Sequence, residues 1–448
     1  MATFDVPTRT ADPEAPKKRP AAWGIVLFLF LFFTLNFADK AAVGLASTRI
    51  RADLDLSATQ YGLLSSAFFW LFALGAVVLS SLLRKISYVW GGALLMSAWV
   101  LSMLPLTVPT TFGVLLGARM VLGFFEGPAH AYCQSVIADR FPPHRRALAG
   151  GLVNAGSSVG PLVAAPVLTW IILTWTWHAA FVVLVITGIV WTVCWLGYTG
   201  AGPFRTTRGA AATAVEQDPN GRIDVPFRRL LTLRSFWGLV LLSFAGYLIS
   251  SLKVSWLPAY LTDGLGYSEQ QVGTLAAIPY VVAVVVLLSA GWLSGYLLQR
   301  GAPSRVARGV VTGTYLLVGG LAMILFTQMS PGTPQLVLVI LAFAVNSVPF
   351  SVAFAGASDF LPAHYRVAFF GCIIAAYSLA GIMAPYGLGR IVDHSATAAQ
   401  GYSSGFLIVG IAVCVLAVIG AFMLDPAKAR ADLERMSATA SAKEGDRS

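Results

Sequence analysis

Two acidic side chains, Asp39 and Glu126, stand well inside apolar stretches, whereas most of the 20 acidic residues lie in polar segments. An ionised group within a bilayer is costly, so such residues usually pair with one another or mark the path of an ion or solute. Burial favours the neutral form of a carboxyl, and a neighbouring cation favours the charged form. Asp39 and Glu126 are therefore candidate proton-binding groups, with a structural ion pair as the alternative.

Three cationic residues, Lys40, Arg119 and Lys253, are expected at a depth similar to that of Asp39. Arg119 precedes Glu126 by seven residues, which is two helical turns, so the two share a face about 10.5 Å apart along the axis. A guanidinium binds a carboxylate through two parallel hydrogen bonds, whereas an ammonium acts as a point charge. Three cations against one carboxylate, with a second carboxylate deeper, predict a surplus positive charge and hence a carboxylate substrate.

Other polar residues of the apolar stretches have weaker assignments. Asn154, Ser157 and Ser378 could hydrogen-bond a substrate, but small polar residues also hold membrane helices together. His130 follows Glu126 by four residues and could relay protons. Lys253 could instead extend its ammonium to the membrane surface. Several aromatic residues could stack on a substrate ring or simply fill the core: Phe68, Phe69, Trp70, Tyr132, Trp256, Tyr260 and Tyr377.

These residues must be positioned by membrane helices. The 448 residues are 57% hydrophobic and 11% charged, whereas a soluble domain carries roughly 25% charged residues. Apolar stretches of the ~20 residues that cross a bilayer recur along the chain and predict an all-α polytopic protein. Twelve helices are expected, at 22–46, 58–83, 88–107, 111–138, 147–173, 177–199, 236–262, 271–298, 308–328, 334–360, 367–392 and 403–424.

The net charge of +10 is explained by topology. If the N-terminus is cytoplasmic, 24 of the 30 Lys and Arg residues fall in cytoplasmic segments, as the positive-inside rule requires. We therefore expect a multi-pass protein of the cell inner (plasma) membrane with both termini inside. The same distribution argues against nucleic acid as a partner.

The chain divides into two related halves. The motif that begins at Asp139 and ends at Arg146 returns 220 residues later between Asp359 and Arg366, and Gly151 and Ser158 return as Gly371 and Ser378. Such repeats typify transporters whose solute site lies between two six-helix bundles. The expected units are a tail at 1–20, bundles at 21–199 and 236–424, a linker at 200–235 and a tail at 425–448.

The segments Asn36-Phe-Ala-Asp39-Lys40 and Arg119-Met-Val-Leu-Gly-Phe-Phe-Glu126-Gly-Pro128 carry a family resemblance. The chain resembles the major facilitator superfamily, and within it the anion:cation symporter family, whose members move organic anions such as sugar acids and phthalate. The resemblance implies twelve helices in two pseudo-symmetric bundles. It also implies that Asp39 and Glu126 are the proton sites.

The sequence departs from that family in places. Lys40 stands where the family usually has Arg, Phe37 where sugar-acid carriers often have Tyr, and Ser157 where they often have Gln. Phe37 and Ser157 make the substrate site less polar, which favours an aromatic acid over a sugar acid. Phe37 is accordingly a candidate substrate-binding residue.

Catalysis is not expected. Gly156-Ser-Ser158-Val-Gly160 and Gly401-Tyr-Ser403-Ser-Gly405 both match the nucleophile elbow of hydrolases, but that elbow requires a strand-to-helix turn. The first match lies inside a predicted membrane helix, where its glycines favour close helix packing. The four cysteines lack metal-ligand spacing, so we expect no metal site. No cofactor is expected, and protons would serve as the coupling ions.

These observations predict a monomeric, proton-coupled symporter that takes up a small organic anion by alternating access. A proton-coupled exporter of metabolites or drugs has the same fold, but the cationic layer favours anion uptake. A membrane ligand sensor is a third interpretation. It is not favoured, because the tails of the sequence are too short for a signalling domain.

Overall fold

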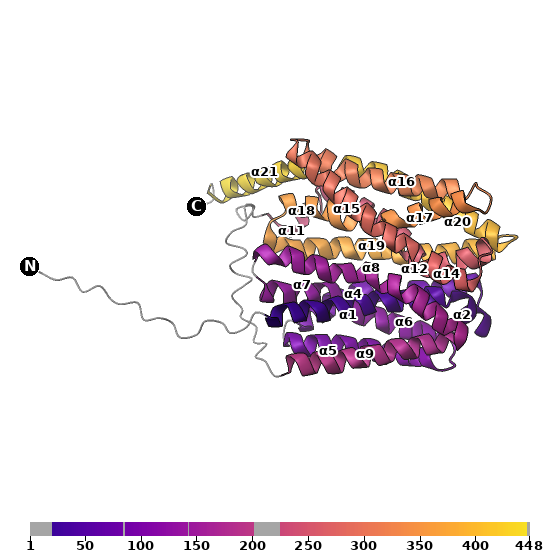
Figure 1. Cartoon of the computed structure of the whole chain (residues 1–448). Coiled ribbons are helices and arrows are strands. Elements are labelled where there is room, and N and C mark those ends of the chain that lie inside the picture. The colour runs from indigo at the N-terminus through magenta and orange to yellow at the C-terminus, as the bar shows by residue number, and fades with distance from the viewer. Residues whose placement is uncertain (1–19, 84–85, 142, 201–224, 446–448) are drawn as a thin grey trace, which may run out of the picture.

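The computed structural model describes residues 20–83, 86–141, 143–200 and 225–445. Every regular element within these ranges is a helix, and twelve of the helical segments are long and apolar enough to cross a membrane. Figure 1 shows the helices of the two halves as two adjacent layers. The twelve-helix prediction is confirmed.

The first half contains six spanning segments, built from eight helices, and the short connecting helix α2. Their bounds are α1 (Pro20–Leu45), α2 (Ser47–Asp53), α3 (Ala58–Trp70), α4 (Phe72–Leu83), α5 (Tyr88–Met103), α6 (Phe112–Glu126), α7 (Ala129–Arg140), α8 (Pro143–Thr174) and α9 (Trp177–Thr199). A short 3-10 turn, η1 (Leu104–Thr107), extends α5. The break between α6 and α7 falls at Gly127 and Pro128, because proline lacks the N–H that would continue the hydrogen-bond ladder. Glu126 therefore ends a helix at membrane depth.

The second half repeats this plan. Its helices are α11 (Phe227–Leu230), α12 (Arg234–Ser255), α13 (Leu257–Ala259), α14 (Glu269–Leu275), α15 (Ile278–Gln299), α16 (Val311–Phe326), α17 (Thr333–Ala344), α18 (Phe354–Phe360), α19 (Ala363–Asp393), α20 (Ala398–Met423) and α21 (Pro426–Gly445). The irregular turns are η2 (Tyr260–Gly264), η3 (Arg305–Val310), η4 (Val345–Ser347) and η5 (Pro349–Ala353).

The observed helix bounds differ from the predicted ones at two places. The seventh span ends at Ser255 rather than near 262, because Pro258 interrupts it and the chain continues as α13 and a π-helical turn. The segment after residue 425, expected as a tail, forms the 20-residue helix α21. Most of the expected linker and of the N-terminal tail lies outside the described residues.

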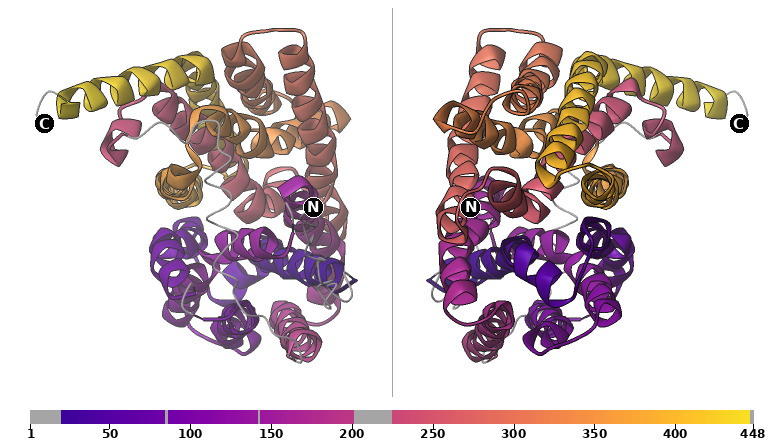
Figure 2. Two further views of the ribbon diagram at one scale, coloured as in Figure 1. Left: turned by 90° about the vertical axis from the view of Figure 1, so that its left-hand side faces the viewer. Right: turned by 90° about the vertical axis from the view of Figure 1, so that its right-hand side faces the viewer.

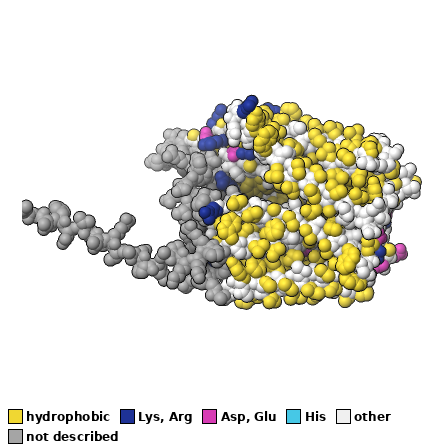
Figure 3. All heavy atoms as spheres, viewed as in Figure 1, with side chains coloured by type: hydrophobic (Ala, Val, Ile, Leu, Met, Phe, Trp, Pro, Cys, Tyr) yellow, Lys and Arg dark blue, Asp and Glu magenta, His cyan; other side chains and the backbone are white. Residues whose placement is uncertain are grey.

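The two ends of the bundle differ in charge. We call them the α21 end, where α7, α11, α18 and α21 lie, and the α2 end, where α2 and α14 lie (Figure 1). Figure 3 shows a wide apolar belt with Lys and Arg gathered mainly at the α21 end. The α2 end carries Arg49 and Arg51 on α2.

The repeat seen in the sequence has a structural counterpart at the α2 end. Ser57 and Gln60 form a capping box at the start of α3, and Ser268 and Gln271 form the same box at the start of α14. Each capping box satisfies helix N–H groups that would otherwise lack partners. The two halves therefore begin equivalent helices with the same local chemistry. Figure 2 shows the halves as two adjacent groups of helices.

The halves pack tightly against each other at the α2 end. Gly62 on α3 lies directly against the Pro385 backbone on α19, and Gly389 lies against the Ala58 backbone. On the other side Gly273 contacts Thr169 of α8. A side chain at any of these glycines would collide with the opposite half, so glycine permits the close approach.

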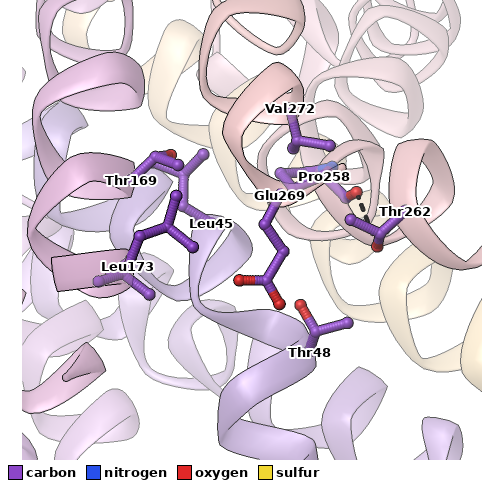
Figure 4. A pocket seen from close by; sticks show the side chains of 9 residues that line it. Leu45, Thr48, Thr169, Leu173, Pro258, Thr262, Glu269 and Val272 are labelled. Atoms are coloured by element: carbon purple, nitrogen blue, oxygen red, sulfur yellow. Dashed lines mark hydrogen bonds between the residues drawn. The ribbon is translucent and has the colours of Figure 1, made fainter. Parts of the chain in front are cut away.

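Polar contacts reinforce this closure. Arg49 pairs with Glu269 at 2.9 Å, and Arg51 pairs with Asp263 at 3.3 Å. A small pocket beside the first pair is lined by residues of both halves, including Thr48, Thr169 and Glu269 (Figure 4).

The start of α3 is also capped by the other half. Asp393, at the end of α19, accepts hydrogen bonds from the Ala58 and Thr59 backbone N–H groups at 2.8 and 2.6 Å. A carboxylate at a helix N-terminus is favoured by both the hydrogen bonds and the helix dipole.

The halves separate toward the α21 end. Gly151 precedes Thr169 on α8 by five full helical turns, and Gly371 precedes Gly389 on α19 by the same spacing, so each glycine faces the opposite half. A Cβ added at Gly151 or at Gly371 would meet nothing within 4 Å. The structure is therefore closed at the α2 end and open between the halves at the α21 end.

We expect Gly62→Val to weaken the closure, because its side chain would strike the Pro385 carbonyl. Spin labels on Ala52→Cys and Ala396→Cys, both exposed at the α2 end, should then report longer distances by electron paramagnetic resonance. Gly113→Val is the matched control, since a Cβ there would meet nothing within 4 Å. Distances in Gly62→Val equal to those of the parent would contradict this account of the closure.

Candidate functional site

A buried ion pair joins α1 to α6. The Lys40 ammonium pairs with the Glu126 carboxylate, and it also donates hydrogen bonds to Asn36 Oδ1 at 2.8 Å and to the Asn36 carbonyl at 2.9 Å. The Lys40 side chain is 11% exposed and that of Glu126 is fully buried. Of this pair, Lys40 is therefore the member whose side chain retains some exposed surface.

Asp39 and Arg119 complete a cluster of four charged groups. Asp39 is buried and lies beside Glu126, although adjacent residues on α1 point in different directions. Arg119 is also buried, and its guanidinium lies 5.0 Å from the centre of the Phe68 ring. Asp39 and Glu126 are both close enough to interact electrostatically with this guanidinium.

Several polar atoms of this cluster have no partner. These are Asp39 Oδ1, Glu126 Oε1, Asn36 Nδ2, and Nε and Nη1 of Arg119. An unmade hydrogen bond to a buried polar group costs about 1–3 kcal/mol, and more when the group is charged. Buried polar atoms without a protein partner are rare, and they often bind a ligand or a proton. The clustering of five such atoms here therefore indicates a binding site.

Lys253 lies apart from this cluster. Its ammonium donates to Asn346 Oδ1 at 2.6 Å and lies 4.3 Å from the centre of the Tyr280 ring, both in the second half. It is buried rather than extended to the surface, and it forms no ion pair with a carboxylate of the described chain. The expected layer of three cations against one carboxylate is therefore divided into two separate centres: a charge-balanced one in the first half and a cationic one in the second.

Two expected hydrogen-bond donors are already engaged. The Ser157 hydroxyl donates to the Asn154 carbonyl at 2.7 Å, and the Ser378 hydroxyl donates to the Ile374 carbonyl at 2.8 Å. Both serines can still accept a hydrogen bond. Asn154 is exposed on α8, and its side chain lies beside that of His130.

His130 lies on α7 beyond the break that follows Glu126. Its ring centre is 5.9 Å from that of Phe33, and Asn154 lies beside it. Among the described hydrogen bonds none joins His130 to Glu126. A proton relay between them would need an intervening water.

The aromatic surroundings were only partly foreseen. The Phe37 ring lies 4.7 Å from the Lys40 ammonium and Phe68 lies 5.1 Å from it, so both rings contact the cation through their faces. Asn36 and Asn346, which hold the two lysines, were not assigned from the sequence. The signal for Asn346 was available, because an amide in an otherwise apolar stretch usually has a specific partner.

With this geometry in view, the comparisons with known proteins identify the family. A family model described as Major Facilitator Superfamily matches residues 28–385. The chain belongs to the Major Facilitator Superfamily. It is therefore a transporter and not an enzyme, in keeping with the transporter names that its relatives carry.

Two curated relatives are sugar-acid carriers by name. The hexuronate transporter of Bacillus subtilis is 28% identical over 86% of this chain and 90% of the relative. The D-galactonate transporter of Escherichia coli is 25% identical over 93% of this chain and 97% of the relative. Both agree with the resemblance to the anion:cation symporters.

Solved structures confirm the superfamily fold. A bacterial homologue of the human lysosomal transporter Spinster, in an inward-facing and unoccupied conformation, has a TM-score of 0.75 at 18% identity. That match covers 93% of this chain and 99% of the solved one. A D-xylose–proton symporter has a TM-score of 0.73 at 15% identity, covering 89% of this chain and 97% of its own.

The two hydrolase-like motifs are helix contacts in this member of the superfamily. Gly156 and Gly160 on α8 lie against the α1 backbone at Phe30 and Thr34, as the packing interpretation predicted. Gly401 lies against Val392 at the start of α20. Neither motif has the strand-to-helix turn of a nucleophile elbow.

The Lys40–Glu126 pair should be needed for stability. Lys40→Met leaves a buried carboxylate without its cation, which should destabilise the protein by about 3–5 kcal/mol. The double variant Lys40→Met, Glu126→Gln should recover part of that loss, as measured by unfolding in detergent. Arg430→Met, which breaks the exposed Arg430–Glu434 pair, should change stability by about 0.5 kcal/mol or less. If Lys40→Met has no larger effect than this control, the pair is not a stabilising contact.

Proposed function

We propose that this transporter is a proton-coupled symporter that carries a small organic anion, a carboxylate, into the cell. The observation that carries the proposal is the buried cluster of Asp39, Lys40, Arg119 and Glu126, with its unpartnered donors and acceptors. The names of the hexuronate and D-galactonate transporters support an organic acid as substrate.

The charges of the cluster suit a proton and an anion together. Two cations and two carboxylates balance, so an anion entering alone would add an uncompensated charge in a medium where charge is costly. The neighbouring Asp39 and Glu126 carboxylates repel each other when both are ionised. One bound proton removes this repulsion and gives the cluster a net positive charge, which a monovalent carboxylate then balances.

We assign a role to each residue on this basis. Asp39 and Glu126 bind protons, and Arg119 and Lys40 bind the substrate carboxylate beside Phe37. Lys253 supplies a second positive centre from the other half, and Asn154, Ser157 and Ser378 are further substrate contacts. His130 relays protons through water toward the open end. No cofactor is required, and the carrier acts as a monomer.

We also propose that the α21 end is cytoplasmic and that the protein resides in the inner membrane. The concentration of Arg and Lys at that end supports this orientation. The structure then corresponds to an inward-open state, from which substrate and proton leave together. Closure of the halves at the α21 end and opening at the α2 end would return the empty site to the outside.

The orientation can be tested with single cysteines in a cysteine-free background. Ser330→Cys, exposed at the α2 end, should react with an impermeant thiol reagent in intact cells. Ala427→Cys, exposed on α21, should react only after the membrane is permeabilised. The reverse pattern would show that the termini lie outside.

Replacement of Glu126 tests the coupling. Glu126→Gln mimics the protonated carboxyl permanently, so the carrier can bind and exchange substrate but cannot release that proton. In proteoliposomes we expect substrate counterflow to persist, while accumulation driven by an inward proton gradient is lost.

Glu434→Gln is the matched control, because Glu434 is an exposed carboxylate on α21 that pairs with its helix neighbour Arg430. It should retain both activities. Accumulation by Glu126→Gln at the level of the unmodified carrier would remove Glu126 from the coupling mechanism.

A further inference from the structure

Near the charged cluster, the two halves bring together a group of aromatic side chains. We call Phe69, Tyr247, Phe350 and Tyr377 the aromatic wall; the last three belong to the second half and Phe69 comes from α3. Ring centres are 4.5 Å apart for Tyr247 and Tyr377, 5.2 Å for Phe350 and Tyr377, and 5.5 Å for Phe69 and Tyr247. Four elements distant in sequence therefore bring their rings together at one place.

The aromatic wall is an accessible surface rather than core. All four side chains are half-buried, whereas the aromatic cluster around Trp256, Tyr260 and Tyr402 is buried almost completely. The Phe69 ring centre lies 4.9 Å from that of Phe68, and the Phe68 ring lies 5.1 Å from the Lys40 ammonium and 5.0 Å from the Arg119 guanidinium. The wall and the charged cluster therefore border the same space between the halves.

The wall offers few hydrogen-bonding groups. The Ser378 hydroxyl, one residue after Tyr377, donates to its own helix, and Asn346 is held by Lys253. The hydroxyls of Tyr247 and Tyr377 have no protein partner among the described residues, and they are the polar atoms that the wall itself contributes. A polyhydroxylated chain needs a partner for each hydroxyl, and this surface would leave most of them unpaired. A flat ring can instead stack against the neighbouring rings or meet them edge to face.

Resting on the proposed function, we infer that the substrate is an aromatic monocarboxylate. Its carboxylate binds Arg119 and Lys40, and its ring lies against the aromatic wall, three of whose four rings belong to the other half. The two tyrosine hydroxyls can each meet one polar substituent on the ring. This assignment separates the carrier from its named relatives, whose hexuronate and D-galactonate substrates carry several hydroxyls.

The test is a binding titration of the purified full-length carrier with three acids that share one carboxylate. Benzoate has an aromatic ring, cyclohexanecarboxylate has a saturated ring of similar size, and galactonate has a hydroxylated chain. Stacking contributes about 0.5–1.5 kcal/mol beyond burial, so benzoate should bind about 2- to 12-fold more tightly than cyclohexanecarboxylate. Galactonate should bind more weakly than both.

Substitutions in the aromatic wall test whether its tyrosines produce the preference for benzoate over cyclohexanecarboxylate. Tyr247→Leu and Tyr377→Leu should each bring the ratio of benzoate affinity to cyclohexanecarboxylate affinity closer to one. The affinity for cyclohexanecarboxylate itself should stay nearly unchanged. Tyr296→Leu is the matched control, since Tyr296 stacks on Trp292 on the exposed face of α15, and it should keep the preference. Arg119→Lys should weaken both ring acids alike, because it acts on the shared carboxylate.

The outcomes separate this inference from the proposed function. Equal affinity for benzoate and cyclohexanecarboxylate, or tighter binding of galactonate, would overturn the aromatic substrate while leaving organic-anion transport in place. Binding of none of the three acids by the unmodified carrier, as judged in both titration and counterflow, would overturn both.

Discussion

Burial of charge in a medium of low dielectric constant is the constraint on which the rest of this structure depends. Each buried charge must have a partner or bind one, because desolvation of an isolated ion costs far more than a folded protein can offset. Lys40 satisfies the constraint through Glu126 and Asn36, and Lys253 does so through Asn346 and the Tyr280 ring. The break after Glu126 and the 3-10 turn η4, which carries Asn346, lie where these groups meet.

The same constraint explains why the halves close so tightly at the α2 end. In the proposed mechanism, water reaching the charged cluster from both ends at once would let substrate and protons pass without coupling. Glycine contacts exclude it along the helix surfaces, and the Arg49–Glu269 and Arg51–Asp263 pairs add contacts that can break and re-form. Surface ion pairs contribute little to stability, which suits contacts that must open in every cycle.

More of the fold than of the candidate site could be predicted from the sequence. Hydropathy and the repeat located all twelve spans, since each span is a property of its own segment. Spacing also placed Arg119 and Glu126 on one helix face. It could not foresee that the flexible Lys40 side chain reaches Glu126 on another helix, or that Lys253 turns toward Asn346 in its own half, because such contacts depend on how helices pack. Of the aromatic wall, the sequence offered only Phe69 and Tyr377 as candidates. Tyr247 and Phe350 were not predicted, because they become neighbours of Tyr377 only after α12, η5 and α19 assemble.

In the proposed mechanism, competition for Lys40 links the proton to the substrate. The Lys40 ammonium already has the Glu126 carboxylate as its partner, so a substrate carboxylate must share or replace that partner. Replacement is unfavourable while Glu126 remains ionised, because a buried carboxylate would lose its cation. A proton on Glu126 removes this cost and releases Lys40 for the substrate. Loss of that proton at the open end restores the internal pair and expels the anion, so a single exchange of partners on Lys40 is enough to couple the two movements.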